Sequence, residues 1–242
     1  MNPESRAEAK KLFADLRAVS RRRKASVVIC PPFLFVPLFG SERLPKGFHI
    51  GAQDCFWERD GSYTGETSPA QLRDHKVSFV LVGHSERRAL GESDAVVSRK
   101  VGVALKEGLV PVICVGESER DEAGAYLEFL QSQLANALSE VTPAKLKQVI
   151  IAYEPVWAIG KKDDEAITGH LLHEMSIFIR RFLAQKYGKK SGFSVPILYG
   201  GSVSPRNTEE ILKDGNVNGL LIGRQSRDPN GFSEILDIVD SL

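Results

Sequence analysis

The chain reads Ala152-Tyr153-Glu154-Pro155-Val156-Trp157-Ala158-Ile159-Gly160 directly after the apolar run Val149-Ile150-Ile151. A short β-branched run that ends near a proline is typical of a buried strand in a parallel sheet. Catalytic groups of parallel α/β proteins lie at the carboxyl ends of such strands. Glu154 is therefore a candidate general base, because the stiff Pro155 and the large Trp157 would restrict the motion of its carboxylate and the access of water to it. The alternative is a solvated carboxylate at a strand end.

Short apolar runs alternate with amphipathic stretches along the rest of the chain, as in repeated βα units around a parallel sheet. We expect strands at 26–30, 49–52, 79–82, 110–115, 149–153, 195–199 and 219–222. We expect helices at 5–19, 93–107, 123–139, 169–187, 208–214 and 232–239, with helix starts or turns at 142–144 and 228–230. Because 42% of the 242 residues are hydrophobic, the chain can form one large core, and we expect a single α/β domain over residues 1–242.

The charge of the chain is nearly balanced, with a net value of +1, which gives no overall attraction to nucleic acid or to anionic membranes. Its one dense basic run is Arg21-Arg22-Arg23-Lys24, directly after the first expected helix. Cations favour the negative end of the helix dipole, so we expect this run to be a solvated helix terminus, with nucleic-acid contact as the alternative.

The three cysteines, Cys30, Cys55 and Cys114, lack metal-ligand spacing, and two of them lie in apolar runs. They are interpreted as core residues in a reducing compartment. The charged N-terminal segment has no apolar signal core, so we expect a cytoplasmic protein. His170 and His173 lie three residues apart in an expected helix, but the segment His173-Glu174-Met175-Ser176-Ile177 lacks the second histidine of a metal-binding motif. We therefore expect no metal site.

Four further segments carry a family resemblance in the same order as in the family. They are Ala52-Gln53-Asp54-Cys55 with Tyr63-Thr64-Gly65-Glu66, then Val82-Gly83-His84-Ser85-Glu86-Arg87-Arg88, Tyr199-Gly200-Gly201-Ser202-Val203 and Leu220-Leu221-Ile222-Gly223. Together with residues 152–160 they resemble the triosephosphate isomerase family over almost the whole chain. The resemblance implies a (β/α)8 TIM barrel that uses no cofactor and interconverts dihydroxyacetone phosphate and glyceraldehyde 3-phosphate.

The resemblance also implies the roles of the catalytic residues. By this resemblance Glu154 is the base and His84 is the neutral electrophile, which are the roles known for the family. The turn after His84 can start a helix, whose N-terminus would favour the neutral imidazole. Glu86 matches an acid that positions its neighbours, with a structural salt bridge as the alternative, and Arg87 and Glu66 match a pair that joins loops across subunits.

Phosphate binding is expected at backbone N–H groups of loops and helix starts, which suit a dianion. Gly200-Gly201-Ser202 follows the penultimate expected strand and Gly223 follows the last, and we expect Ser202 to cap the next helix as well. Gly160 matches the family's phosphate-contacting glycine in its mobile loop. Arg224 stands where the family usually has a second glycine, either as a substrate contact or as an outward-pointing arginine.

Two features depart from the family pattern. Lys161-Lys162-Asp163-Asp164-Glu165-Ala166 replaces the usual loop tip, and we hypothesise that Lys161 or Lys162 supplies cationic charge. The first strand of the barrel, with its Asn-x-Lys motif and catalytic lysine, is missing from this sequence. We expect severely reduced turnover if the protein truly begins at Met1, through loss of a preorganised electrostatic contact. A start at an internal methionine, a truncation and a natural loss all remain open.

The resemblance implies a homodimer, in which the loop 54–69 would enter a neighbour's pocket. That pocket borders the missing segment, which weakens the expectation. One alternative function is a catalytically silent barrel that binds a phosphorylated ligand. Another is a different phosphate-handling barrel enzyme, which the segments around Glu154 and His84 argue against.

Overall fold

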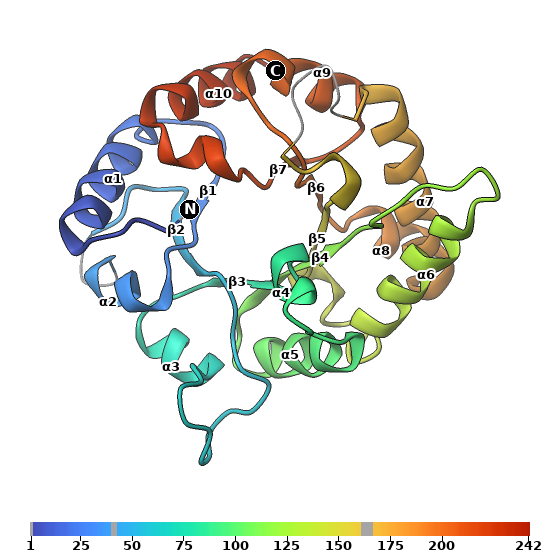
Figure 1. The fold of residues 1–242 in the computed structure, drawn as a ribbon, viewed down its shortest axis with the longest axis horizontal. Coiled ribbons are helices and arrows are strands. Elements are labelled where there is room, and N and C mark those ends of the chain that lie inside the picture. The colour runs from blue at the N-terminus through green and yellow to red at the C-terminus, as the bar shows by residue number, and fades with distance from the viewer. Residues whose placement is uncertain (1, 40–42, 161–166) are drawn as a thin grey trace.

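The computed structural model describes residues 2–39, 43–160 and 167–242. Seven strands form one sheet in chain order, and every neighbouring pair is parallel. The strands are β1 (Val27–Ile29), β2 (Phe48–Ala52), β3 (Phe79–Val82), β4 (Val110–Val115), β5 (Ile150–Tyr153), β6 (Ile197–Tyr199) and β7 (Gly219–Leu220). The sheet curls around a central axis with helices outside it (Figure 1). The expected parallel α/β barrel architecture is thus confirmed, with seven strands in the described chain.

Helices follow the strands along the chain, and the long ones cover the outer face of the sheet, whereas the short α4 lies inside their ring in Figure 1. They are α1 (Arg6–Val19), α2 (Val36–Phe39), α3 (Pro69–Asp74), α4 (Ser85–Ala89), α5 (Asp94–Lys106), α6 (Ala125–Ala137), α7 (Gly169–Tyr187), α8 (Lys189–Phe193), α9 (Pro205–Asp214) and α10 (Pro229–Ser241). Short 3-10 turns lie at Phe33–Phe35, Leu146–Gln148, Val156–Ala158 and Arg224–Arg227. All the long helices that the sequence predicts are present.

Local sequence signals explain where several helices begin. The side chains of Ser5, Ser93 and Thr168 each accept a hydrogen bond from a backbone N–H in the first turn of α1, α5 and α7. At α10, Asp228 provides the cap and Pro229 occupies the first turn, as the sequence predicts. These caps fix the points at which the chain turns from each loop into the helix that covers the sheet.

The register of the strands aligns their carboxyl ends. Val82 lies opposite Ile113, Val115 opposite Tyr153, and Tyr153 opposite Tyr199. Residues that directly follow β3, β4, β5 and β6 therefore reach the same rim of the barrel. This alignment brings together side chains that are far apart in the sequence.

The core has two parts, because alternate residues of each strand point to opposite faces. Val112, Cys114 and Ala152 form a small cluster, with Leu81 and Leu198 packed against it. The larger cluster joins the other strand residues, such as Ile113 and Ile151, to helix residues such as Leu134 and Ile179. Cys30, Cys55 and Cys114 are all free thiols, and Cys55 and Cys114 are buried.

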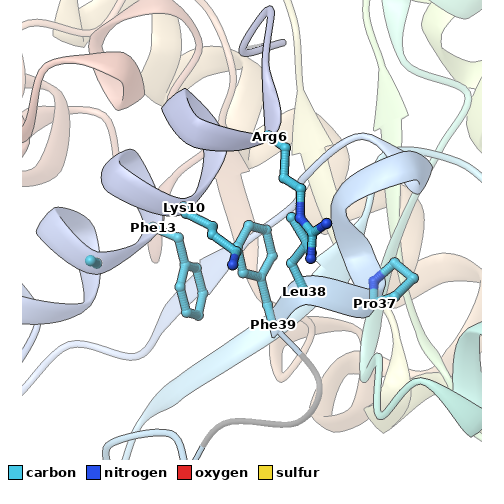
Figure 2. A pocket seen from close by; sticks show the side chains of 7 residues that line it. Arg6, Lys10, Phe13, Pro37, Leu38 and Phe39 are labelled. Atoms are coloured by element: carbon cyan, nitrogen blue, oxygen red, sulfur yellow. The ribbon is translucent and has the colours of Figure 1, made fainter.

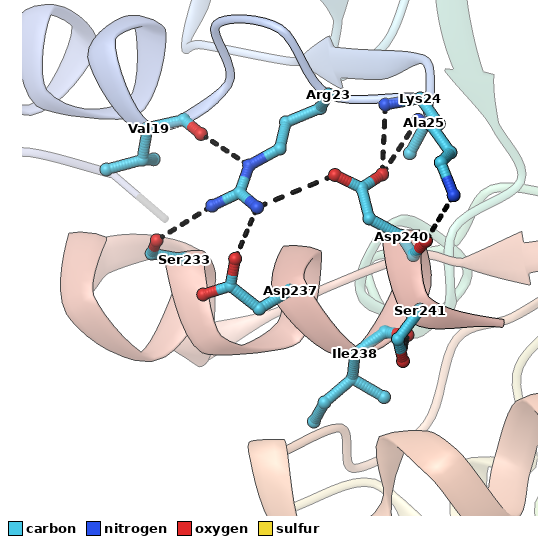
Figure 3. Close-up of polar contacts among 9 residues, drawn as sticks. All are labelled: Val19, Arg23, Lys24, Ala25, Ser233, Asp237, Ile238, Asp240 and Ser241. Carbon is cyan, nitrogen blue, oxygen red and sulfur yellow. Dashed lines mark hydrogen bonds and ion pairs between the residues drawn. The ribbon is translucent and has the colours of Figure 1, made fainter.

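The basic run 21–24 corrects one sequence expectation. α1 ends at Val19, so the run lies beyond the helix, and Arg22 has a positive φ of 62°. Arg23 and Lys24 both bind α10, and Lys24 stays exposed to solvent as well (Figure 3). The expectation of a solvated terminus is wrong for Arg23, because acidic side chains more than two hundred positions away lie against it.

No helix in the described ranges is long and apolar enough to cross a membrane.

Candidate active site

Glu154 lies at the rim directly after β5, and only 2% of it is exposed. Its backbone N–H donates to the carbonyl of Val115 at the end of β4, at 2.8 Å, which continues the strand pairing by one residue. Its carboxylate Oε2 accepts a hydrogen bond from the backbone N–H of Ser85 at 3.0 Å. The solvated carboxylate that the sequence left open is therefore not what the structure contains.

His84 reaches the same place from β3. It is the N-cap residue of α4, and its Nδ1 accepts a hydrogen bond from the backbone N–H of Glu86 at 3.3 Å. A ring nitrogen that accepts carries no proton, so the neutral ring holds its proton on Nε2. Nε2 lies 3.1 Å from Oε1 of Glu154, without the alignment of a hydrogen bond. The imidazole thus presents an N–H donor beside a buried carboxylate.

Burial raises the pKa of Glu154, because desolvation disfavours the charged carboxylate. His84, the Ser85 backbone N–H and the Cys114 thiol act in the opposite direction and limit the rise in this pKa. A carboxylate with a raised pKa is a stronger base than an ordinary surface glutamate, and so is better suited to remove a proton from carbon.

Two glycines let neighbouring segments approach Glu154, one at its side chain and one at its backbone. A Cβ on Gly200 would lie 2.8 Å from Cγ of Glu154, and a Cβ on Gly116 would lie 1.8 Å from its carbonyl oxygen. Any side chain at either position would displace Glu154. The Gly-Gly turn after β6 therefore shapes the site as well as providing N–H groups.

Sequence reasoning missed a second buried acid on this rim, Glu117, which is 1% exposed. Its Oε1 accepts hydrogen bonds from the Tyr153 hydroxyl at 2.8 Å, the Trp157 indole at 2.8 Å and Nε of Arg120 at 3.0 Å. The Arg120 guanidinium also stacks 5.0 Å from the Trp157 ring centre. This cluster fixes the segment after Glu154. The available signal was Gly116-Glu117 directly after β4, which parallels Gly83-His84 after β3.

Glu86 and Arg87 do not join the Glu154 carboxylate. The Glu86 side chain is 77% exposed, and its Oε2 lies 3.9 Å from Nδ1 of His84. Arg87 pairs with Asp54 at 2.9 Å within the same chain. Asp54 also binds the buried Lys100, so Arg87 here ties the loop after β2 to α4.

The four expected phosphate contacts occupy three loops at the same rim. Gly160 has φ +77° and Gly223 follows β7. Oγ of Ser202 donates to the carbonyl of Ala158 at 3.2 Å, which joins the loop after β6 to the loop after β5. Arg224 is exposed at the start of the 3-10 turn 224–227. Lys161 and Lys162 lie outside the described residues.

The expectation that Ser202 caps the next helix is wrong. The N-cap residue of α9 is Ser204, whose backbone N–H binds Oδ1 of Asn207 at 2.9 Å. Pro205 occupies the first turn of α9, three residues before the expected range 208–214 begins. The carbonyl of Ser202 instead accepts from the Asn207 side chain at 3.0 Å, which holds the loop against the start of α9.

A cavity of about 400 Å³ lies away from this rim, between α1 and α2. Arg6 and Lys10 extend over Phe13, Leu38 and Phe39 there (Figure 2). None of its lining residues belongs to the Glu154 site. Within the described ranges no group of three or more His, Cys, Asp or Glu side chains could hold a metal ion.

Comparisons with known proteins place the chain among sequences of one family. The family model "Triosephosphate isomerase" matches residues 1–239. A triosephosphate isomerase from Thermoanaerobacter sp. strain X514 is 42% identical over 235 residues, which are 96% of this chain and 93% of that protein. Those from Citrifermentans bemidjiense and Moorella thermoacetica are 39% and 38% identical, each over at least 95% of this chain and 92% of the relative.

Proposed function

Because this chain belongs to the triosephosphate isomerase family, we propose that it interconverts dihydroxyacetone phosphate and glyceraldehyde 3-phosphate, with Glu154 as the base. The observation that carries this proposal is the 3.1 Å approach of His84 Nε2 to the buried Glu154 carboxylate. The family is one of intramolecular isomerases, so the reaction starts and ends with the same atoms and needs no second substrate.

The chemistry requires a base and a hydrogen-bond donor that face the same two carbons. Removing a proton next to a carbonyl builds negative charge on the carbonyl oxygen, which a donor must stabilise. Glu154 would accept the proton from one carbon and return it to the other. His84, with its proton on Nε2, would donate to the oxygen of the enediolate. Glu86 would act indirectly, since its backbone N–H donates to Nδ1 of His84 and thereby orients the ring.

The phosphate group would lie across the loops after β5, β6 and β7. Backbone N–H groups near Gly160, Ser202 and Gly223 would bind its oxygens, because preorganised amides suit a dianion. The Ser202 bond to Ala158 supports this role, since it holds two of these loops together. Arg224 extends from the third loop and would add a positive charge beside the phosphate.

We infer further that two copies of the chain associate and that the protein acts in the cytoplasm. The family resemblance supports the dimer, as do the exposed apolar side chains Leu34, Tyr63 and Leu90. Light scattering of the purified protein tests whether two copies associate. A mass of 26.7 kDa in solution would contradict it.

The isomerase proposal is tested by turnover of glyceraldehyde 3-phosphate in a coupled assay, with Glu154→Gln and His84→Gln as variants. General-base catalysis contributes on the order of 10²–10⁴ in rate, so Glu154→Gln is expected to lower kcat by about that factor. Ser202→Ala should raise KM more than it lowers kcat. Calorimetric binding of a phosphoglycolate-type analogue without any turnover would favour the silent phosphate-binding barrel instead.

A further inference from the structure

A small cavity of about 10 Å³ lies beside Glu154, where the ends of β3, β4 and β5 meet. Gly83, Ser85, Arg88, Cys114 and Glu154 are among the residues that line it. A space of this size is close to the smallest that holds one water molecule, provided that at least two polar groups face it. The cavity is therefore significant only if its lining offers unsatisfied donors and acceptors.

Arg88 offers such a donor. Its Nε donates to the carbonyl of Gly83 at 2.7 Å, and its Nη1 binds Asp94 at 2.6 Å. Nη2 is shielded from solvent and has no hydrogen-bond partner among the described residues. A buried donor left without a partner destabilises the folded protein, and more so when the group is charged. This nitrogen lies 3.0 Å from the position of a Cβ on Gly83, directly behind the residue that presents His84.

Glu154 offers the matching acceptor. An ionised carboxylate has about four lone-pair sites. The Ser85 N–H and the Cys114 thiol occupy some of them, and Oε1 has no hydrogen-bond partner in the described chain. A water molecule can accept from a guanidinium and donate to a carboxylate at the same time. The two unsatisfied groups are thus complementary through one water.

We propose that Arg88 is a positioning residue of the active site, and that one ordered water molecule in this cavity links its Nη2 to the Glu154 carboxylate. The same guanidinium holds the Gly83 carbonyl, and Gly83 has a positive φ of 73° that fixes the turn into His84. One side chain would then set the position of both the base and the electrophile. Its positive charge would also help to keep the buried carboxylate ionised.

The other polar and charged groups near the Glu154 carboxylate have partners that the structure shows. From α4 and β4, His84 and Cys114 contact the Glu154 carboxylate directly. From α5, Asp94 is paired with Arg88 itself. Glu117, on the same rim, is already bound by Tyr153, Trp157 and Arg120. Apart from His84, Arg88 is the cation that shares this cavity with Glu154, so its removal should be felt at the carboxylate.

The first test is a crystal structure of the unmodified protein at a resolution that shows ordered waters. We expect one water between Arg88 Nη2 and the Glu154 carboxylate, and we expect it to be lost in Arg88→Met. An unmodified protein with no density in this cavity would overturn the water link. This test needs no turnover, so it stands even if the proposed isomerase activity is absent.

The second test measures kcat and KM against pH and rests on the proposed function. Arg88→Met should lower kcat roughly tenfold to a hundredfold with little change in KM, because the base is misplaced while phosphate binding remains. The acidic limb of the kcat/KM profile should move to higher pH, since loss of a nearby cation favours the protonated carboxyl. Arg88→Lys should restore part of this shift. Asp94→Asn, which keeps the cation, is the matched control.

A profile for Arg88→Met that superimposes on that of the unmodified protein would refute the positioning role. If Arg88→Met does not fold, Arg88→Lys supplies the same comparison, because the shorter ammonium cannot bind Gly83 and the water together. If the unmodified protein has no turnover, the titration of Glu154 is followed by NMR of labelled glutamate, with Glu154→Gln identifying its signal. An unchanged titration in Arg88→Met then overturns the proposal.

Discussion

At the scale of single residues, burial of Glu154 should cost stability. Its pKa is raised above the ordinary value of 4.5. Between 4.5 and the raised pKa the unfolded chain is ionised while the folded protein keeps its proton, so the free energy of unfolding falls as pH rises through this window. We predict that Glu154→Gln has a higher Tm than the unmodified protein at neutral pH, and that the difference disappears in acid.

The measurement is thermal unfolding, followed by circular dichroism over a series of pH values. Glu119→Gln is the matched control, because Glu119 is an exposed carboxylate on the same rim. An equal change in Tm at neutral pH for both variants would contradict an effect of burial. The opposite outcome, a lower Tm for Glu154→Gln, would mean that its hydrogen bond from Ser85 outweighs the desolvation.

The residues at the rim were predictable from sequence only in part. Glu154 and His84 could be found because each directly follows an apolar strand, and the parallel register then places them together. The burial of the Glu154 side chain was not predictable from the sequence. Glu154 is enclosed by Gly200 and Gly116, which come from other strands, and local sequence does not reveal such contacts. Glu117 was missed for the same reason, since its partners include residues 36 and 40 positions away.

At the scale of elements, a buried ion cluster joins the loop after β2 to α4 and α5. Lys100 on α5 is 2% exposed and binds both Asp54, at 2.6 Å, and Glu92. Removing one partner of a buried ion pair costs about 3–5 kcal/mol, because the remaining charge has lost its compensation. We predict that Lys100→Met lowers the free energy of urea unfolding by about this amount.

Two comparisons make that prediction specific. Lys106→Met changes an exposed lysine of the same helix and should alter stability little. Adding Asp54→Asn and Glu92→Gln to Lys100→Met should recover much of the loss, because no unpaired charge then stays buried. A triple variant as unstable as the single one would show that Lys100 acts through packing alone.

Most element boundaries lie within about two residues of those expected, but α9 and α10 begin at Pro205 and Pro229, three residues before their expected ranges. α7 matches the expected range 169–187, and every expected strand is present within about two residues. The sequence reading did not predict α2, α3 and α8, which are four to six residues long. So short a helix spans little more than one turn, too little for an apolar periodicity to show. Their positions depend on the larger elements they join.

At the scale of the whole molecule, contacts between α1 and α10 connect the two ends of the described chain. β1 and β7 are the end strands of the described sheet, and α1 and α10 lie side by side next to them (Figure 1). Arg23 pairs with Asp237 and Asp240 and donates to Ser233 at 3.1 Å, while the Lys24 backbone N–H binds Asp240 at 2.9 Å (Figure 3). Together with the ion pair of Arg227 and Glu8 at 2.7 Å, these bonds link the two ends of the described chain.

We predict that Arg23→Met lowers the free energy of unfolding by about 1–2 kcal/mol, because charge-assisted bonds of a half-buried arginine are lost. Added salt should reduce the difference between variant and unmodified protein, since part of it is screened. Hydrogen exchange locates the effect. If the ends depend on each other, exchange should rise in both α1 and α10, whereas Arg21→Met, an exposed neighbour, should leave both unchanged. A rise confined to residues 20–25 would mean that the contact is local and that the barrel keeps its ends together through core packing alone.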